Sequence, residues 1–296
     1  MGERATVAVL GAGGTMGMPI AGHIAEAGFE VRAWNRTRER AEPLADKGIE
    51  IPATAREAST GASVVLTLLS DADAVLETME EVDGGLAGMR EGTTWLQMST
   101  IGIAGTERCA ELADERELVL VDAPVVGTKK PAEEGTLTVL ASGPDDARER
   151  CEPIFDAVGQ KTVWLGEAGT GTRMKLVVNS WLLSLVEGLA ETVAFAEGIG
   201  IDPGQFLETI SGSPVDNPYA QMKGRMMIER DFEPSFKLEL AAKDARLVLE
   251  AMERHDLELP MLGAIRAQLE EAAAEHGDKD MAAAYLASAP KQPAER

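Results

Sequence analysis

Residues Val7-Ala-Val-Leu10 and Gly11-Ala-Gly-Gly-Thr-Met-Gly17 form a short apolar run that leads directly into a glycine-rich loop. A strand followed by a glycine turn and then by a helix is typical of dinucleotide-binding loops. The glycines let the backbone approach a pyrophosphate closely, and the free N–H groups at the helix start face its negative charge. The stretch therefore predicts a nucleotide-binding loop, with contacts from Gly11, Gly13, Gly14, Thr15, Met16 and Gly17.

The glycine spacing in this loop departs from the common pattern by one residue. Counted from Gly11 and Gly13, the third glycine comes one residue late, at Gly17. Counted back from Gly14 and Gly17, Ala12 replaces the first glycine. We expect a loop with one extra residue. A tight turn without a ligand is the alternative, but the strand context favours nucleotide binding.

The residues after the second predicted strand indicate which dinucleotide binds. An acidic residue there would bind both ribose hydroxyls of NAD, but this chain has Asn35-Arg36-Thr37-Arg38. Arg36 can stack on adenine and pair with a 2′-phosphate, and Thr37 and Arg38 add donors. The segment Asn35, Arg36 and Thr37 therefore predicts a preference for NADP(H) over NAD(H). The alternative is that the arginines only solvate the start of a helix.

Up to residue 165 the sequence alternates strand and helix patterns. Predicted strands are Thr6–Leu10, Glu30–Trp34, Val64–Leu69, Thr94–Met98, Leu118–Asp122, Leu137–Ala141 and Thr162–Leu165. Amphipathic stretches between them include Gly17–Ala27, Thr37–Lys47, Ala72–Glu81 and Ala104–Glu115. This alternation predicts an α/β, doubly wound, mostly parallel sheet of the Rossmann type over residues 1–165, with helices on both faces.

From residue 166 to 296 the pattern is helical throughout and predicts an all-α domain, to which the family resemblance described below adds roles in substrate binding and oligomerisation. Predicted helices are Thr172–Gly198, Pro203–Ser211, Tyr219–Glu229, Leu238–His255 and Leu259–His276. The middle of the long central helix, Trp181–Val186, is apolar nearly all round, so we expect it to be buried. The polar tail Ala287–Arg296 is expected to fray.

Composition limits the possible partners. The 296 residues carry a net charge of −22, which repels nucleic acid and anionic lipid and makes clustered cations informative. Cys109 and Cys151 lack disulfide-framework or metal-ligand spacing, so no metal is expected and a reducing cytoplasm fits. Neither a secretory leader nor a membrane span is evident, and the longest apolar run is too short to cross a bilayer.

Lys175 and Asn179 are the candidate catalytic pair. They are four residues apart, so they share one face of a helix that becomes apolar there. A lysine in such surroundings must find a partner or lose its proton, and its ammonium can protonate a carbonyl oxygen as hydride reaches the carbon. The alternative is that Lys175 extends out of a buried helix into solvent. The turn Asp122–Gly135 offers backbone amides for a substrate carboxylate.

These motifs together resemble the β-hydroxyacid dehydrogenase superfamily. The glycine loop, the Ser99-Thr100-Ile101 turn, Asp122–Gly135, Gly169–Asn179 and Lys243-Asp244 occur in order and at fitting separations. The resemblance covers about residues 5 to 287 and extends to 3-hydroxyisobutyrate dehydrogenase and tartronate semialdehyde reductase. It looks closest to the NADPH-linked glyoxylate/succinic semialdehyde reductases.

The resemblance implies a role for each matching residue. Lys175 would be the general acid/base that interconverts a hydroxy acid and its aldehyde or keto acid, with Asn179 as its companion. Further cofactor contacts would be Leu69, Ser70, Thr100 and Lys243. The substrate would meet Ser99, Thr100, Val126, Gly127, Thr128, Lys175, Asn179, Phe236 and Asp244. The family also implies a homodimer or homotetramer formed through the central helix.

Three departures from the family pattern bear on the substrate. Val126 stands where the family usually has Ser, which removes a hydroxyl donor to the carboxylate. Trp181 adds bulk after Lys175, and Ser70 stands where Pro is common. The first two changes predict a less polar pocket, so a longer or more apolar aldehyde or ketone is an open alternative.

Two other functions compete with a hydroxyacid dehydrogenase. Imine reductases share the two-domain plan and an Asn-Arg-Thr segment, but they generally lack a lysine at the position of Lys175. A dehydrogenase-like nucleotide-binding module without chemistry is the non-enzymatic alternative, and the presence of both Lys175 and Asn179 argues against it.

Overall fold

The computed structural model describes residues 5–289, and its chain forms two compact units. The first unit extends up to Lys175 and the second begins at Leu176. The sequence-based division after residue 165 falls earlier, in the loop that precedes the long helix α8.

The first unit is built on a five-stranded parallel sheet with strand order β2-β1-β3-β4-β5. Its strands are β1 (Thr6–Leu10), β2 (Glu30–Trp34), β3 (Val64–Thr67), β4 (Thr94–Gln97) and β5 (Val119–Asp122). The chain order reverses between β1 and β3, and open α/β sheets bind ligands beside such a reversal. The predicted fold class is confirmed.

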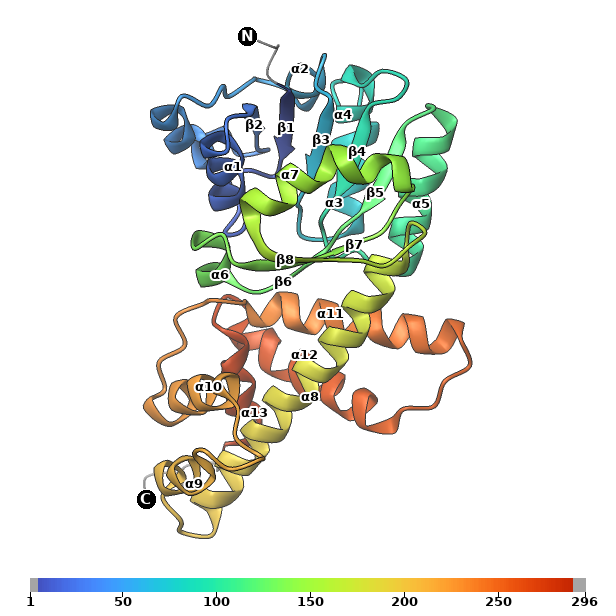
Figure 1. The fold of residues 1–296 in the computed structure, drawn as a ribbon. Helices are drawn as coiled ribbons and strands as arrows, with labels where there is room; N and C mark the ends of the chain where they lie inside the picture. The colour runs from blue at the N-terminus through green and yellow to red at the C-terminus, as the bar shows by residue number, and fades with distance from the viewer. Residues whose placement is uncertain (1–4, 290–296) are drawn as a thin grey trace. The chain divides into compact units, whose positions relative to one another are not determined.

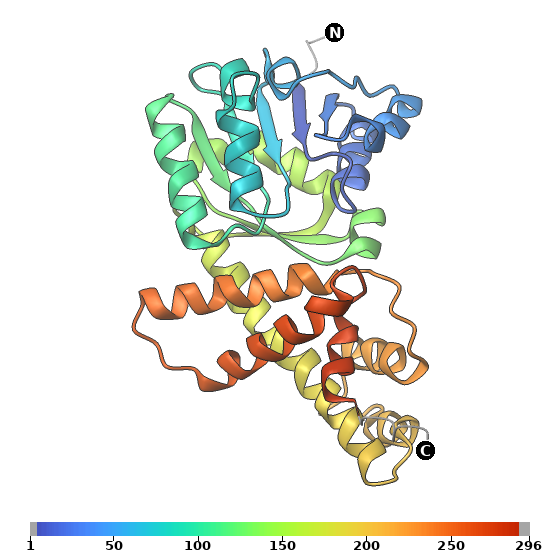
Figure 2. The same ribbon diagram turned by 180° about the vertical axis from the view of Figure 1, so that it is seen from behind.

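Helices cover both faces of this sheet. One face carries α1 (Gly17–Glu26) and α7 (Arg148–Val158), and the other carries α3 (Ala72–Glu80) and α5 (Gly102–Glu115), as Figures 1 and 2 show from opposite sides. Side chains alternate along a strand, so neighbouring residues of β1 enter different cores. Val7 and Val9 belong to the first core and Ala8 and Leu10 to the second.

The last predicted strands do not extend the main sheet. A second sheet contains β6 (Val125–Val126), β7 (Leu137–Ala141) and β8 (Gly159–Trp164), with β6 antiparallel and β8 parallel to β7. Short helices complete the unit: α2 (Ala55–Ser59), α4 (Gly85–Gly88), α6 (Lys129–Glu133) and the 3₁₀ turn η3 (Asp145–Ala147).

The predicted amphipathic helix Thr37–Lys47 is wrong. Two 3₁₀ segments, η1 (Arg38–Arg40) and η2 (Glu42–Lys47), replace it. The Thr37 side chain forms no capping bond, and Pro43 disfavours a helical conformation in the residue before it. Helix α7 was not predicted, because Pro153 lies inside it and obscures the pattern.

The second unit is entirely helical, as predicted. The long helix α8 (Thr170–Gly198) begins in the first unit and continues into the second. After it come α9 (Pro203–Ile210), α10 (Pro218–Glu229), α11 (Leu238–Arg254), α12 (Pro260–His276), the 3₁₀ segment η4 (Met281–Ala284) and α13 (Tyr285–Ser288). The predicted frayed tail overlaps α13 at its start, and its residues 290–296 lie outside the described residues.

The middle of α8 is less buried than predicted. Leu183 and Val186 are buried, but Trp181 is 68% exposed, so the expectation of all-round burial is wrong there. The helix is long and apolar enough to cross a membrane, with a mean hydropathy of 1.3 over its most apolar window, of which 44% is buried. Partial burial of this kind is also found in core helices, so its composition alone does not place α8 in a membrane.

Candidate functional site

The predicted cofactor residues of the first unit gather at one edge of the main sheet. The glycine loop follows β1, Asn35–Thr37 follow β2, Leu69 and Ser70 come after β3, and Thr100 comes after β4. All four strands are parallel, so the segments that follow them lie at the same edge. This is the edge at which doubly wound sheets bind nucleotides.

Two glycines of the loop have no room for a side chain. A Cβ on Gly11 would lie 2.2 Å from the Leu68 carbonyl oxygen, and the backbone φ of Gly11 is +98°. A Cβ on Gly17 would lie 2.2 Å from the carbonyl oxygen of Gly11. Gly14 is less constrained, with the nearest atom at 3.3 Å. The loop thus turns at Gly11 and packs at Gly17, and Gly14 and Thr15 are exposed.

The segment after β2 supports the glycine loop and carries an uncommitted cation. Asn35 Oδ1 accepts a hydrogen bond from Gly13 N at 3.2 Å, and Asn35 Nδ2 donates to the Thr37 carbonyl oxygen at 2.8 Å. Arg36 is exposed and has no hydrogen bond or ion pair within residues 5–289. Asn35 therefore shapes the loop, while the Arg36 guanidinium remains available to a phosphate.

Ser99 connects the ends of β3 and β4. Its hydroxyl accepts from Leu69 N at 2.9 Å and donates to the Thr67 carbonyl oxygen at 3.3 Å, and the residue is buried. These bonds hold Leu69 in place and occupy the hydroxyl that the sequence assigned to substrate. Thr100 is the half-buried side chain of this turn.

The turn Val126–Thr128 lies between β6 and α6. Gly127 has a φ of +134°, and a Cβ there would lie 2.6 Å from Leu137 Cδ2. Val126 is half-buried, and Thr128 starts α6 without a side-chain capping bond. The turn therefore depends on glycine, and its polar groups are mainly backbone.

Sequence reasoning missed the buried carboxylate that holds the start of α8. Asp122 accepts from Thr172 N at 2.7 Å and from Thr172 Oγ1 at 2.8 Å. Ser142 Oγ accepts from Gly171 N at 2.9 Å. Burial raises the pKa of Asp122 although these bonds oppose the shift. The signal was an acidic residue at the end of an otherwise apolar strand.

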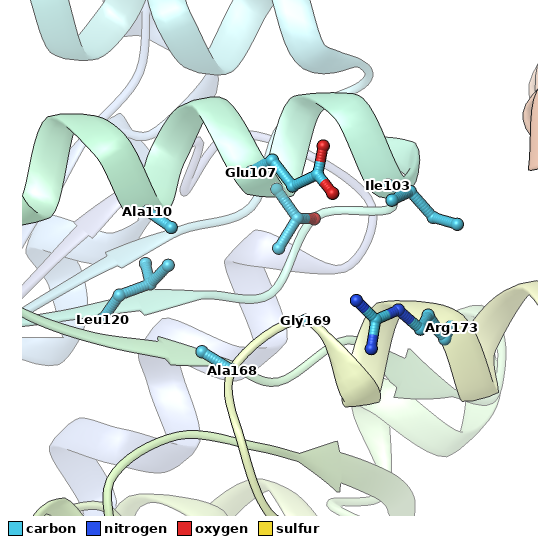
Figure 3. A pocket seen from close by; sticks show the side chains of 8 residues that line it. Ile103, Glu107, Ala110, Leu120, Ala168, Gly169 and Arg173 are labelled. Carbon is cyan, nitrogen blue, oxygen red and sulfur yellow. The ribbon is translucent and has the colours of Figure 1, made fainter. Parts of the chain in front are cut away.

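A small cleft lies beside this anchor, between α5 and the start of α8 (Figure 3). Its walls are mostly apolar, and the side chains of Glu107 and Arg173 extend beside it. The lining residues are Ile103, Thr106, Glu107, Ala110, Leu120, Ala168, Gly169 and Arg173. None of them is a predicted site residue.

Lys175 lies just beyond this anchor on α8, and Asn179 follows one helical turn later. Lys175 is half-buried, whereas Asn179 is only 1% exposed. Asn179 Nδ2 donates to Asp244 Oδ2 at 2.7 Å, and Lys243 Nζ pairs with the other oxygen, Asp244 Oδ1, at 2.9 Å. The structure thus brings together three predicted residues of the second unit, Asn179 of α8 and Lys243 and Asp244 of α11.

Phe236 is held at the start of α11 by a buried ion pair. Asp280 pairs with Lys223 at 2.5 Å and accepts from the backbone N–H groups of Ser235 and Phe236 at 2.9 and 3.2 Å. Burial raises the pKa of Asp280, but Lys223 and the backbone amides of Ala282 and Ser235 outweigh it and hold that pKa below its usual value. The sequence analysis singled out neither Lys223 nor Asp280.

Trp181 does not share the face of Lys175. Six residues of α-helix turn the side chain about 120° away from Lys175, and Trp181 is exposed whereas Asn179 is buried. The expectation that Trp181 makes the catalytic pocket less polar is therefore wrong, and Val126 alone supports that argument.

Residues 5–289 contain no group of three or more His, Cys, Asp or Glu side chains that could hold a metal ion. The glycine cradle and Arg36 instead fit a dinucleotide. A parallel sheet with such a loop defines the class of dinucleotide-binding proteins.

Comparison with known families identifies the particular group. Residues 6–166 match the family model of the NAD-binding domain of 6-phosphogluconate dehydrogenase. Residues 169–287 match a second family model, described as NAD-binding of NADP-dependent 3-hydroxyisobutyrate dehydrogenase. The chain belongs to the β-hydroxyacid dehydrogenase superfamily and is a nicotinamide-dependent oxidoreductase acting on CH–OH groups.

Individual relatives agree with this assignment. The Bacillus subtilis oxidoreductase YfjR is 34% identical over 94% of this chain and 97% of its own. The chloroplastic glyoxylate/succinic semialdehyde reductase 2 of Arabidopsis thaliana is 30% identical over 85% of this chain and 70% of its own. A Mycobacterium tuberculosis 3-hydroxyisobutyrate dehydrogenase structure with L-serine has a TM-score of 0.85 and 27% identity, covering 96% and 99%.

Imine reductases share the fold but less closely. The Myxococcus stipitatus imine reductase with NADP+ has a TM-score of 0.67 and 20% identity, covering 95% of this chain and 99% of its own. This likeness shows the fold alone and does not favour imine chemistry over hydroxyacid chemistry.

Proposed function

We propose that this protein uses NADPH to reduce a small aldehyde or keto acid, with Lys175 as the proton donor. The observation that carries the proposal is the position of Lys175 on α8, one turn before a buried Asn179–Asp244 pair. The pair provides polar groups one turn from Lys175 on the same face of α8, as a positioned acid/base requires.

The proton balance follows from this arrangement. When bound, reduced nicotinamide would supply a hydride to the carbonyl carbon. The Lys175 ammonium gives a proton to the carbonyl oxygen, which becomes the hydroxyl of the product. The neutral amine then regains a proton from solvent. In the reverse direction the neutral amine accepts the hydroxyl proton.

The preference for NADPH rests on Arg36. It is exposed and uncommitted within the described chain, next to the Asn35 side chain that supports the glycine loop. A carboxylate at this position would favour NAD, and none is present there. The other proposed cofactor contacts are the glycine loop, Thr37, Leu69, Ser70, Thr100 and Lys243.

The substrate is proposed to be a semialdehyde whose carboxylate meets the backbone of the Val126–Thr128 turn, with Thr100 and Phe236 as further contacts. The Arabidopsis relative is named for glyoxylate and succinic semialdehyde. Val126 puts an apolar side chain where the family has a hydroxyl, so we expect longer semialdehydes, which have more apolar surface, to be used better than glyoxylate.

We further propose a cytoplasmic homodimer or homotetramer. Val177, Trp181 and Phe195 on α8 are exposed by 63%, 68% and 66%. Exposed apolar side chains along one helix fit a second copy of the chain better than solvent.

Replacing Lys175 tests the proposed chemistry. Lys175→Ala should lower NADPH-dependent reduction of succinic semialdehyde by at least about a hundredfold, because general acid catalysis is lost. Turnover is followed by NADPH absorbance, and NADPH binding by calorimetry. Lys161→Ala removes an exposed lysine from β8 and should change neither.

If a folded Lys175→Ala variant keeps near-normal turnover, Lys175 is not the proton donor. Turnover of imines that survives the substitution would favour imine reduction, and cofactor binding without any turnover in the parent protein would favour a non-catalytic module.

A further inference from the structure

The Asn179 amide has one chemically allowed orientation in its pair with Asp244. A carboxylate accepts hydrogen bonds and donates none, and the second oxygen of Asp244 is already paired with Lys243. The atom of Asn179 at 2.7 Å from Asp244 Oδ2 must therefore be the amide nitrogen. The assignment follows from the partner's chemistry as well as from the coordinates.

This orientation leaves the carbonyl oxygen of Asn179 as a buried acceptor. Asn179 is 1% exposed, and its Oδ1 accepts no hydrogen bond within residues 5–289. Buried acceptors without a donor are destabilising, so such a group in a catalytic pair points to a donor that engages it in the working enzyme.

We propose that Asn179 acts in the reaction as a hydrogen-bond acceptor, and that Asp244 is the positioning residue that fixes it in this role. The donor that fits is the Lys175 ammonium, one turn earlier on the same face of α8. One ammonium N–H is then held by Asn179, which leaves another directed at the substrate oxygen. The inference rests on the proposed function of Lys175.

The competing role for Asn179 is donation. Its amide nitrogen carries a second N–H, which could bond to the substrate directly. The two roles differ in what they require at position 179. An acceptor role is met by a carboxylate as well as by an amide, whereas a donor role requires the amide nitrogen.

Exchanging the two side chains distinguishes these roles. Asn179→Asp alone sets two carboxylates against each other and should lower kcat by at least about tenfold. In the double variant Asn179→Asp/Asp244→Asn, the amide at 244 donates to the carboxylate at 179, whose second oxygen remains an acceptor. We expect the exchange to recover at least about tenfold in kcat over Asn179→Asp.

Two further variants complete the test. Asp244→Asn alone should lower kcat by about tenfold, because the Asn179 amide loses its acceptor-only partner, while the variant keeps the melting temperature of the parent protein. Glu250→Gln makes the same change of charge at an exposed site on α11 and should leave kcat unaltered. A loss confined to kcat separates positioning from general loss of structure.

The acceptor role is overturned if the folded, NADPH-binding double variant is as slow as Asn179→Asp, or if Asp244→Asn keeps the parent kcat. Lys175→Ala is assayed in parallel. Full activity of Lys175→Ala would refute the proposed function itself. If Lys175→Ala loses activity, the result of the double variant tests only the role of Asn179.

Discussion

Arg36 is the residue that we propose determines cofactor choice. Arg36→Ala should weaken NADPH binding by about ten- to a hundredfold, because one or two charge-assisted hydrogen bonds to the 2′-phosphate are lost. NADH lacks that phosphate, so its affinity should hardly change and serves as the internal control. Calorimetry with both coenzymes measures the difference, and equal losses for the two would contradict the assignment.

Glu187 gives the second unit an unusual dependence on pH. It is 3% exposed, and neither carboxyl oxygen has a hydrogen-bond partner within the described residues. Burial, with a smaller contribution from Glu191, raises the pKa of Glu187 to about 7. Between its unfolded pKa and pH 7 the folded state binds more protons, so this group lowers stability as pH rises through that window.

Glu187→Gln should therefore stabilise the protein at pH 8 by on the order of 2–3 kcal/mol and have a much smaller effect near pH 4.5. Chemical denaturation at the two pH values measures this difference. Glu229→Gln, at an exposed site on α10, is the matched control. A stabilisation of equal size at both pH values would show that ionisation of Glu187 is not its cause.

At the scale of elements, the glycine loop has the strictest geometry. Gly11→Ala places a methyl group against the Leu68 carbonyl and strains a φ of +98°, whereas Gly14→Ala meets its nearest atom at 3.3 Å. We expect Gly11→Ala to lower the melting temperature and NADPH affinity well beyond Gly14→Ala. Thermal melts with and without NADPH measure both effects, and equal behaviour of the two variants would refute this geometry.

Elements with a strong local pattern were predictable from sequence. The strands β1, β2 and β7 have the predicted bounds, because alternating or continuous apolar residues end at clear turn signals. The segment after β2 was not predictable, because its periodicity resembles a helix while Pro43 and the missing cap disfavour one. The second sheet also escaped prediction, since pairing partners are set by distant residues.

Some residues of the candidate site could also be predicted from sequence, and others could not. Lys175 and Asn179 were found from their spacing on one helix, and the structure adds the partner, Asp244, that orients Asn179. Asp122 and Asp280 were missed because their function depends on amides distant in sequence, at Thr172 and Ser235. Single buried carboxylates have no sequence spacing that reveals such partners.

For the whole molecule, the exposed apolar side chains of α8 predict self-association. Trp181→Glu should shift the protein towards a monomer, because a charge would be buried in the interface. Size-exclusion chromatography with light scattering measures the mass. Val82→Glu alters another exposed apolar residue, in the first unit, and should leave the mass unchanged. If Trp181→Glu keeps the oligomeric mass of the parent protein, the exposed apolar face of α8 is not the interface.

The proposed function requires direct transfer of hydride from the nicotinamide to a carbonyl carbon. NADPH carrying deuterium at the transferable C4 position, incubated with the protein and succinic semialdehyde, tests this transfer when the product is analysed by mass spectrometry. We predict a hydroxy acid with one deuterium on its carbinol carbon. A panel of semialdehydes and keto acids that yields no labelled alcohol, with NADPH bound but unconsumed, would contradict the account.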